Sequence, residues 1–461
     1  IAGCWAAIGA ARQGVKVALV DKGATVSSGA GGSGIDHWIG AVTNPVSKIS
    51  PEEFTQAAQD SLGGWRSAIT THVTSHESWD CLLELEKMGM KIRDSLDEFK
   101  GAEFRDEATK LLFAYDYNAK YCLRVWGNKV KEFLYKECKR LGVAIYDHVF
   151  VTSLLTAVGK QGARVVGATG VNSRTGEFYI FKGKASVLSM YFPQRQWIFS
   201  TEIRGLTYSH RTPNLTGDGH AMAWKAGALL AGVEASGPGG SGPYGYPQYG
   251  HGNAGNTWYA CTMVDSDGKE IPWVDRDGNL LKTVSERYLP APGQKFFLSG
   301  GDYGQLDPRY RGPHMLPIKG MAAFGGAGGG RRAGAGAEVE AKLPLYADLP
   351  SMPAHERRVI FGLMVAQEGK TLIPIYRTYT QAGFDPDKDL LQGYDNVGFP
   401  KWRQSAGGGT LSGGGPIVDW NLMTSLEGLF AGGAQVFHTG PHATAAATGR
   451  YAGRHAAQYA N

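Results

Sequence analysis

Gly3 and Asp21 have the residue types and the spacing of half a dinucleotide-binding motif. Gly3 opens an alanine-rich stretch with helical spacing that ends at Gly14, and residues 15–20 follow as a buried-strand pattern closed by Asp21 and Lys22. In a Rossmann βαβ unit the last motif glycine lets the helix pack closely, and an acid about twenty residues later binds the adenosine ribose. The first strand and the first two glycines would then lie before residue 1. The segment also fits a plain helix packed on a strand.

A second glycine-rich loop follows this strand directly. It comprises Ser28, Gly29, Ala30, Gly31 and Gly32. Because Gly29, Gly31 and Gly32 have no side chains, the backbone amides of this loop can approach a flat ring or a phosphate closely. Considered alone, the segment is equally well explained as an ordinary surface loop.

Two later segments place helix starts next to groups that could do chemistry. Asp218 stands in a Thr-Gly-Asp-Gly turn that opens an alanine-rich helical stretch. Residues 426–457 predict a buried strand, a glycine turn, a loop with His438 and His442, and then a helix of small residues. The free amides and the dipole of such a helix start favour an electron-rich group.

Histidines and arginines near these loops are the candidates for moving a proton and for binding an anion. His438 and His442 precede the last helix, and Arg450 follows one or two turns later. Further candidates are Arg204, His210 and Arg211 before the Thr-Gly-Asp-Gly turn, and Arg377 among aromatic residues. A helix cap explains each histidine as well as catalysis does, and solvated loop charges explain the arginines before the turn. The charges at residues 355–358 are expected on a solvated face.

The periodicity of the sequence predicts the elements that must position these residues. Residues 51–141 are largely helical, including 78–88 and 127–141. In the second of these helices the outward positions are Lys129, Lys131, Lys136 and Lys139. Residues 143–188 predict a β-meander, and the low-complexity stretch 325–336 predicts a flexible linker.

Composition bounds the class of protein. The chain has 461 residues, 43% of them hydrophobic and 19% charged, which is typical of a soluble globular protein of about two or three domains. A net charge of +5 is too small to indicate a nucleic-acid partner. No uncharged apolar window approaches the roughly 18 residues of a membrane helix. The five cysteines form no C-x-x-C pair, so no metal site is expected. Their odd number and scattered positions suit reduced thiols in the cytoplasm.

Taken in order, these segments resemble the fumarate reductase and succinate dehydrogenase flavoprotein family, which includes the flavin subunit of adenylylsulfate reductase. The resemblance runs through the truncated motif at Gly3, the loop at 28–32, the turn at 216–219, a strand-turn-strand at 255–271 and the C-terminal block. It implies that FAD lies extended on a Rossmann-like domain, and that an inserted capping domain closes over the substrate.

The resemblance also implies roles for the matching residues. It places Gly3 at the pyrophosphate, Asp21 with Lys22 at the adenosine ribose, the loop at 28–32 near the isoalloxazine, and Asp218 at the inner wall of the flavin domain. Gln435 stands where the family has an acid that binds the ribityl chain. The residues implied at the flavin edge are Gly440, His442, Ala443, Thr444 and Ala445.

Three departures from the family pattern bear on the chemistry. The strand that ends at residues 188–191 lacks the family's two glycines. The family's covalent histidine is replaced within residues 26–28, so non-covalent FAD is expected. The elements that clamp a dicarboxylate are missing, which argues against fumarate or succinate as the substrate.

We therefore expect an α/β fold with a Rossmann-like FAD-binding domain at residues 1–240 and 346–461 and an inserted α+β capping domain at 241–345. The expected activity is that of an FAD-dependent oxidoreductase subunit passing electrons between flavin and a small anionic substrate. An iron–sulfur subunit is the expected partner, in the cytoplasm or peripheral to the inner face of a membrane. An adenylylsulfate-reductase-like enzyme, a non-catalytic flavin electron relay and a nicotinamide-only dehydrogenase remain alternatives.

Overall fold

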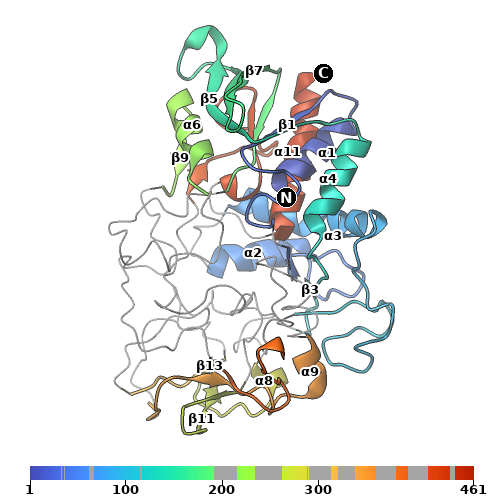
Figure 1. Ribbon diagram of the computed structural model, residues 1–461, viewed down its shortest axis with the longest axis vertical. Helices are drawn as coiled ribbons and strands as arrows, with labels where there is room; N and C mark the ends of the chain where they lie inside the picture. Colours follow the sequence, from blue (N-terminus) through green and yellow to red (C-terminus); the bar gives the residue numbers. More distant parts are fainter. Residues whose placement is uncertain are drawn as a thin grey trace.

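The computed structural model describes most of the chain, and the fold is given for that part. The described residues are 1–32, 34–35, 37–61, 67–114, 117–191, 215–233, 262–287, 289, 313–319, 338–359, 380–392, 414–436 and 442–461. Figure 1 shows the N-terminal and C-terminal helices together in the upper part of the view, and the strands of residues 263–315 in the lower part.

Two pairs of parallel strands accompany the first helix. α1 (Ala2–Ala11) leads to β1 (Ala18–Asp21), which pairs in parallel with β4 (Ala144–Asp147). The second pair joins β8 (Ser186–Leu188) to β17 (Leu429–Ala431), two segments far apart in the sequence. Parallel strands with a covering helix are typical of Rossmann-like units. The predicted mixed α/β class is confirmed.

Gly3 lies where α1 meets both strand pairs. A Cβ atom at this position would lie 2.8 Å from Ser189 Oγ, just after β8, and 3.4 Å from Leu19 Cδ1 in β1. A side chain at this position would crowd the Ser189 hydroxyl, whereas glycine lets the helix lie close to both strands. This is the packing that the last glycine of a dinucleotide motif allows.

The last helix, α11 (His442–Ala460), packs on α1 with the two backbones in contact. A methyl group on Gly449 would overlap the backbone of Ala2, and one on Gly453 would overlap the backbone of Ala6. The two contacts advance together along both helices, so the helices run in the same direction, as Figure 1 shows. Small residues thus fix the position of α11 relative to α1.

The helices that precede β4 are α2 (Pro51–Ser61), α3 (Ala68–Lys87) and α4 (Val130–Arg140). The two helices predicted from periodicity in this region are confirmed as α3 and α4. α3 begins earlier than the predicted start at residue 78, because Ser67 caps it by accepting a hydrogen bond from the amide of residue 70.

One outward position predicted for α4 is wrong. Lys129, Lys136 and Lys139 are exposed as expected, but Lys131 is buried, with 4% of its surface exposed. It lies beside Val130 in the first turn of α4, on the side that packs against α1. The helical period alone does not show how far around a helix its neighbours reach.

Residues 149–182 form a three-stranded antiparallel sheet. Its order is β5 (Val149–Thr156), β6 (Val165–Asn172) and β7 (Phe178–Lys182), with a single 3₁₀ turn, η1 (Ala157–Gly159), after β5. The predicted meander is confirmed over these strands. The strands at its two ends, β4 and β8, instead belong to the parallel pairs.

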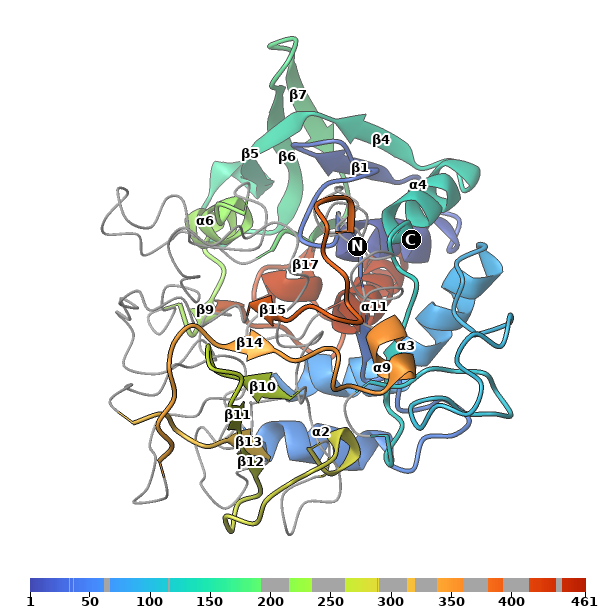
Figure 2. The same ribbon diagram turned by 60° about the horizontal axis from the view of Figure 1, so that its bottom comes forward.

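A four-stranded sheet, seen in Figure 2, joins segments on both sides of the predicted boundary at residues 345 and 346. Its order is β11 (Glu270–Ile271), β10 (Met263–Val264), β14 (Tyr346–Ala347) and β15 (Leu391–Gln392). Because that boundary would divide a hydrogen-bonded sheet, we propose that the inserted segment extends at least to residue 392.

The remaining elements are short, apart from one helix. They are β2 (His37–Ile39) paired with β3 (Cys122–Arg124), β9 (Leu230–Ala231) paired with β16 (Gly415–Pro416), β12 (Trp273–Val274) paired with β13 (His314–Met315), α6 (Asp218–Ala226), α8 (Val284–Arg287), α9 (Ala354–Arg358) and η5 (Gly433–Gln435). Among the described residues, no helix is both long and apolar enough to cross a membrane.

Candidate functional site

The glycine loop after β1 lies against the starts of α1 and α11. A Cβ atom on Gly31 would lie 3.1 Å from Ile1 Cγ1 and 3.7 Å from His442 Nδ1, and one on Gly32 would overlap the carbonyl of Ser27. Three segments predicted to serve one site are therefore neighbours. The first turn of a helix carries unpaired amides and the positive end of the dipole, so two helix starts beside a glycine loop favour an anionic or electron-rich group.

Asp21 and Lys22 tie this loop to a second predicted segment. Asp21 accepts hydrogen bonds from the Ser28 hydroxyl and from the backbone amide two residues on, the latter at 2.8 Å. Lys22 Nζ donates to Thr216 Oγ1 at 2.8 Å and pairs with Asp218 Oδ2 at 2.5 Å. The structure thus brings Asp218, at the start of α6, beside the residues predicted at the adenosine ribose.

Gln435 is completely buried and is held by a histidine that the sequence analysis missed. Its Nε2 donates to His220 Nδ1 at 3.1 Å, and His220 Nε2 donates to the Gly414 carbonyl at 2.6 Å. Burial lowers the pKa of His220, in keeping with a neutral ring that accepts at Nδ1. Gln435 Oε1 has no hydrogen-bond partner in the described part of the chain, and it occupies the space that a side chain on Gly219 would fill.

His37, beside His442, and its strand partner Arg124 are further buried residues that sequence reasoning missed. The rings of His37 and His442 are 5.8 Å apart, and His37 pairs in register with Arg124 across β2 and β3. The Arg124 guanidinium donates to the Phe113 carbonyl at 2.7 Å and to Tyr117 Oη at 3.1 Å. Arg124 stands alone in a short apolar run and His37 follows Asp36, so nothing in the local pattern connects either residue to a site.

Glu356 contradicts the expectation that residues 355–358 are a solvated face. It is 5% exposed, in α9. Burial raises the pKa of Glu356, while the Arg124 charge and a hydrogen bond from Tyr117 oppose that rise. The exposed-face expectation fails because α9 packs against β3 and the loop around Tyr117, which no local pattern predicts.

Replacing Glu356 by glutamine should change the pH dependence of stability. Because the folded protein holds this proton to higher pH than the unfolded chain does, the contribution of Glu356 to the free energy of unfolding falls with rising pH above the ordinary carboxyl pKa, until the raised value is passed. One proton limits the slope of this contribution to about 1.4 kcal/mol per pH unit. Glu356→Gln should remove it, so the stability of the variant relative to the parent should rise with pH. Urea denaturation from pH 4 to 8 measures this.

The exposed Glu338 provides the matched control for this experiment. Glu338→Gln should keep the parent's slope, since its carboxylate is equally hydrated in both states. Identical slopes for the parent and Glu356→Gln would show that the pKa of Glu356 is the same in the folded and unfolded states.

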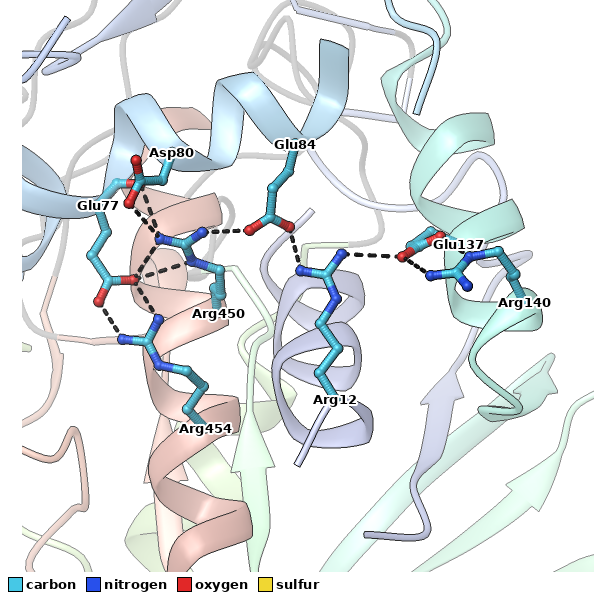
Figure 3. A network of polar contacts seen from close by, with 8 residues as sticks. All are labelled: Arg12, Glu77, Asp80, Glu84, Glu137, Arg140, Arg450 and Arg454. Atoms are coloured by element: carbon cyan, nitrogen blue, oxygen red, sulfur yellow. Dashed lines mark hydrogen bonds and ion pairs between the residues drawn. The ribbon is translucent and has the colours of Figure 1, made fainter. Parts of the chain in front are cut away.

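Arg450, predicted at the substrate, is directed at carboxylates of α3. Its guanidinium contacts Glu84 Oε1 at 2.6 Å and Glu77 Oε2 at 3.0 Å, while Arg454 also bonds Glu77 and Arg12 bonds Glu84. Figure 3 shows the whole network, which comprises Arg12, Glu77, Asp80, Glu84, Glu137, Arg140, Arg450 and Arg454. These contacts favour a structural role, and a catalytic role stays a prediction.

The other predicted site residues divide into two groups. Ala443, Thr444 and Ala445 lie in the first turns of α11, and Gly29 and Ala30 lie in the loop beside it. Outside the described residues lie Arg204, His210, Arg211, Arg377, His438 and Gly440. Their roles stay predictions.

Known structures share this fold. Adenylylsulfate reductase from Archaeoglobus fulgidus matches with a TM-score of 0.65 at 20% identity, over 100% of this chain and 67% of that chain. E. coli quinol fumarate reductase matches with a TM-score of 0.57 at 18% identity, over 100% and 68%. Mycobacterium smegmatis Sdh1 matches with a TM-score of 0.52 at 18% identity, over 100% and 67%. No curated protein matches the sequence significantly.

The protein family described as FAD binding domain matches residues 1–253, more than half of the chain. That match spans α1, the glycine loop and α6, which form most of the arrangement described above. The resemblance inferred from the motifs is confirmed, and the chain belongs to the FAD-binding domain family, with a fold shared by adenylylsulfate reductase, fumarate reductase and succinate dehydrogenase flavoproteins.

Proposed function

We propose that the chain binds FAD non-covalently and is a subunit of an oxidoreductase acting on a small anionic substrate. The observation that carries the proposal is the meeting of the glycine loop with the starts of α1 and α11. Bound FAD would supply the hydride or electron transfer. The protein's own tasks are to hold the cofactor, exclude water, and position the substrate and a proton.

The residues present fit FAD. Gln435 Oε1 is a buried acceptor without a partner among the described residues, and buried acceptors are nearly always hydrogen-bonded. A ribityl hydroxyl would satisfy it, in the role that the family assigns to an acid at this position. The glycine loop and the start of α11 would face the ring, and Asp21 with Lys22 would hold the adenosine ribose.

His442, His37 and Arg124 are the residues we propose for the substrate side of the site. His442 begins α11 beside the glycine loop, and the ring of His37 is 5.8 Å from that of His442, while His37 pairs in register with Arg124. A histidine can give or take a proton near neutral pH, and a guanidinium attracts a carboxylate or an oxyanion. His438, Arg204, His210, Arg211 and Arg377 stay further candidates for this task.

We also propose that electrons pass to or from an iron–sulfur partner, because the five cysteines of this chain contain no C-x-x-C pair that would suit a cluster of its own. The inserted segment from residue 241 to at least 392 would cap the substrate. An adenylylsulfate-reductase-like activity is the second candidate. It is favoured by the serines that stand where covalent members of the family have their histidine.

A visible spectrum of the purified protein, repeated after acid precipitation, tests the proposal. We expect flavin absorption that moves to the supernatant. Colour retained in the pellet would contradict non-covalent binding, and a colourless protein that does not take up added FAD would overturn the proposal. Bleaching of the bound flavin by sulfite would favour the second candidate.

Replacing Gln435 by leucine should weaken FAD binding about 10-fold, the worth of one hydrogen bond of about 1.4 kcal/mol. Leucine fills the same space but offers no acceptor to the cofactor. Titration of the apoprotein with FAD, followed by flavin fluorescence, measures the affinity. The control is Gln458→Leu, at an exposed position of α11, the helix whose start borders the site. This variant should bind FAD like the parent. Equal FAD affinities for the two variants would show that Gln435 does not hydrogen-bond the cofactor.

A further inference from the structure

Two cysteines and a lysine are buried together between α1 and α4. Cys4 is 2% exposed, Cys138 is fully buried, and Lys131 Nζ lies 3.7 Å from Cys4 Sγ. Cys138 Sγ is 3.6 Å from the Cys4 carbonyl, to which it donates. The two thiols and the ammonium group thus form one cluster in the core beside the first turn of α1.

The lysine needs a negative partner, because removing an ammonium group from water costs several kcal/mol unless an anion compensates it. In the described part of the chain, no carboxylate lies within ion-pair distance of Lys131, and Cys4 Sγ is the polar group that its Nζ contacts. The hydrogen bond from Cys138 and the Lys131 charge lower the pKa of Cys4 against its burial. Asp21 acts in the opposite direction on Cys4.

Cys138 differs from Cys4 in its protonation. Its hydrogen bond to Cys4 and its burial raise the pKa of Cys138, so this thiol keeps its proton. Two neighbouring thiols of unequal acidity can divide an oxidation between them, because the more acidic sulfur reacts with an oxidant and the second resolves the product.

We propose that Cys4 and Cys138 are a dithiol that hydrogen peroxide oxidises to a disulfide, with Lys131 as the cation that holds the Cys4 sulfur. The Cys4 thiolate attacks one peroxide oxygen and the O–O bond breaks, which gives a sulfenic acid and a hydroxide that takes up a proton to leave as water. The Cys138 sulfur then attacks Cys4 Sγ, the S–O bond breaks, and the hydroxyl leaves as water with the Cys138 proton. Two thiols lose two electrons, and one peroxide becomes two waters.

The position of Cys4 connects this site to the cofactor. Cys4 follows Gly3 in the first turn of α1, the helix start that faces the glycine loop. A disulfide would tie this turn to α4 and shift it relative to the loop. Oxidation should therefore weaken FAD binding about 10-fold, a consequence that rests on the proposed function, whereas the disulfide itself does not.

Peptide mass spectrometry of the full-length protein, treated with graded hydrogen peroxide and then blocked at its free thiols, tests the proposal. We expect a Cys4–Cys138 link that dithiothreitol reverses, while Cys81, buried in α3 with a pKa raised by burial, stays a thiol. Peroxide that leaves Cys4 reduced while other cysteines react would overturn the proposal. So would a bond from Cys4 to Lys131.

Variants separate the roles within the cluster. Cys138→Ser should stop the reaction at the Cys4 sulfenic acid, which dimedone traps. Lys131→Met should slow the loss of the Cys4 thiol at least about 10-fold at pH 7, because fewer sulfurs are thiolates, and the exposed Lys136→Met should not. Equal rates for both lysine variants would overturn the role of Lys131. If a variant fails to fold, the presence or absence of the Cys4–Cys138 disulfide in the peroxide-treated parent protein tests the proposal. A link without flavin in the protein would support this site while contradicting the proposed function.

Discussion

Replacing Gly453 by alanine should destabilise the protein by about 3 kcal/mol, the upper end of the usual cost of overpacking. The added methyl group would overlap the backbone of Ala6, and a backbone cannot turn away as a side chain can. Alanine is by itself the better helix former by about 1 kcal/mol, so a net loss can come only from the contact between α1 and α11. Urea denaturation followed by far-UV circular dichroism measures the change.

Gly14→Ala is the matched control, because a Cβ atom there would meet no other atom within 4 Å. Gly14 has a φ of +82°, so the control should lose about 1 kcal/mol through backbone strain. Gly453→Ala should also release FAD, since α11 carries His442 to the glycine loop. A Gly453→Ala protein as stable as the parent would show that the two helices can separate slightly without cost.

The N-terminal half of the fold could be predicted from the sequence because its signals are local. The helix that starts near Gly3, the strand that ends at Asp21 and the helix that starts at Asp218 each have a boundary residue within their own segment. Their assembly into one site could not be predicted from those signals alone. That assembly was predicted only from the order of the motifs along the chain, which resembles the order in a known family.

The failures share one physical cause. Lys131 and Glu356 are ionisable residues that the sequence places at helical positions of ambiguous orientation. Each is buried by an element distant in the sequence: Lys131 by α1, and Glu356 by β3 with the loop around Tyr117. Charged residues are rarely buried unless paired, so burial becomes predictable only once the partner element is placed.

His37 and Arg124 were missed for a related reason. Their importance comes from register: the pairing of β2 with β3 brings them together, and α11 then supplies His442 from the other end of the chain. No spacing rule connects three such positions. Sequence reasoning could find such a cluster only by asking which charged residues stand within short apolar runs.

Replacing Arg450 by methionine should cost about 3 kcal/mol of stability, the lower end of the cost of breaking a buried ion pair, because Glu77 and Glu84 lose their shared cation but keep Arg454 and Arg12. Arg140→Met removes a guanidinium that is 66% exposed, and should cost less than about 1 kcal/mol. Chemical denaturation of both variants, with flavin content measured alongside, makes the comparison.

Arg450→Met combined with Glu77→Gln and Glu84→Gln should recover part of the loss, since glutamines need no cation, while Arg454 and Arg12, which are about one third exposed, lose their carboxylates at small cost. If Arg450 acts only by holding α11 against α3, the triple variant should regain flavin and electron transfer together with stability. If Arg450 binds the substrate, the triple variant should fold and bind FAD but stay inactive. The opposite result is also informative. If Arg450→Met is as stable as the parent but has lost turnover, the catalytic role predicted for Arg450 from the sequence would be supported.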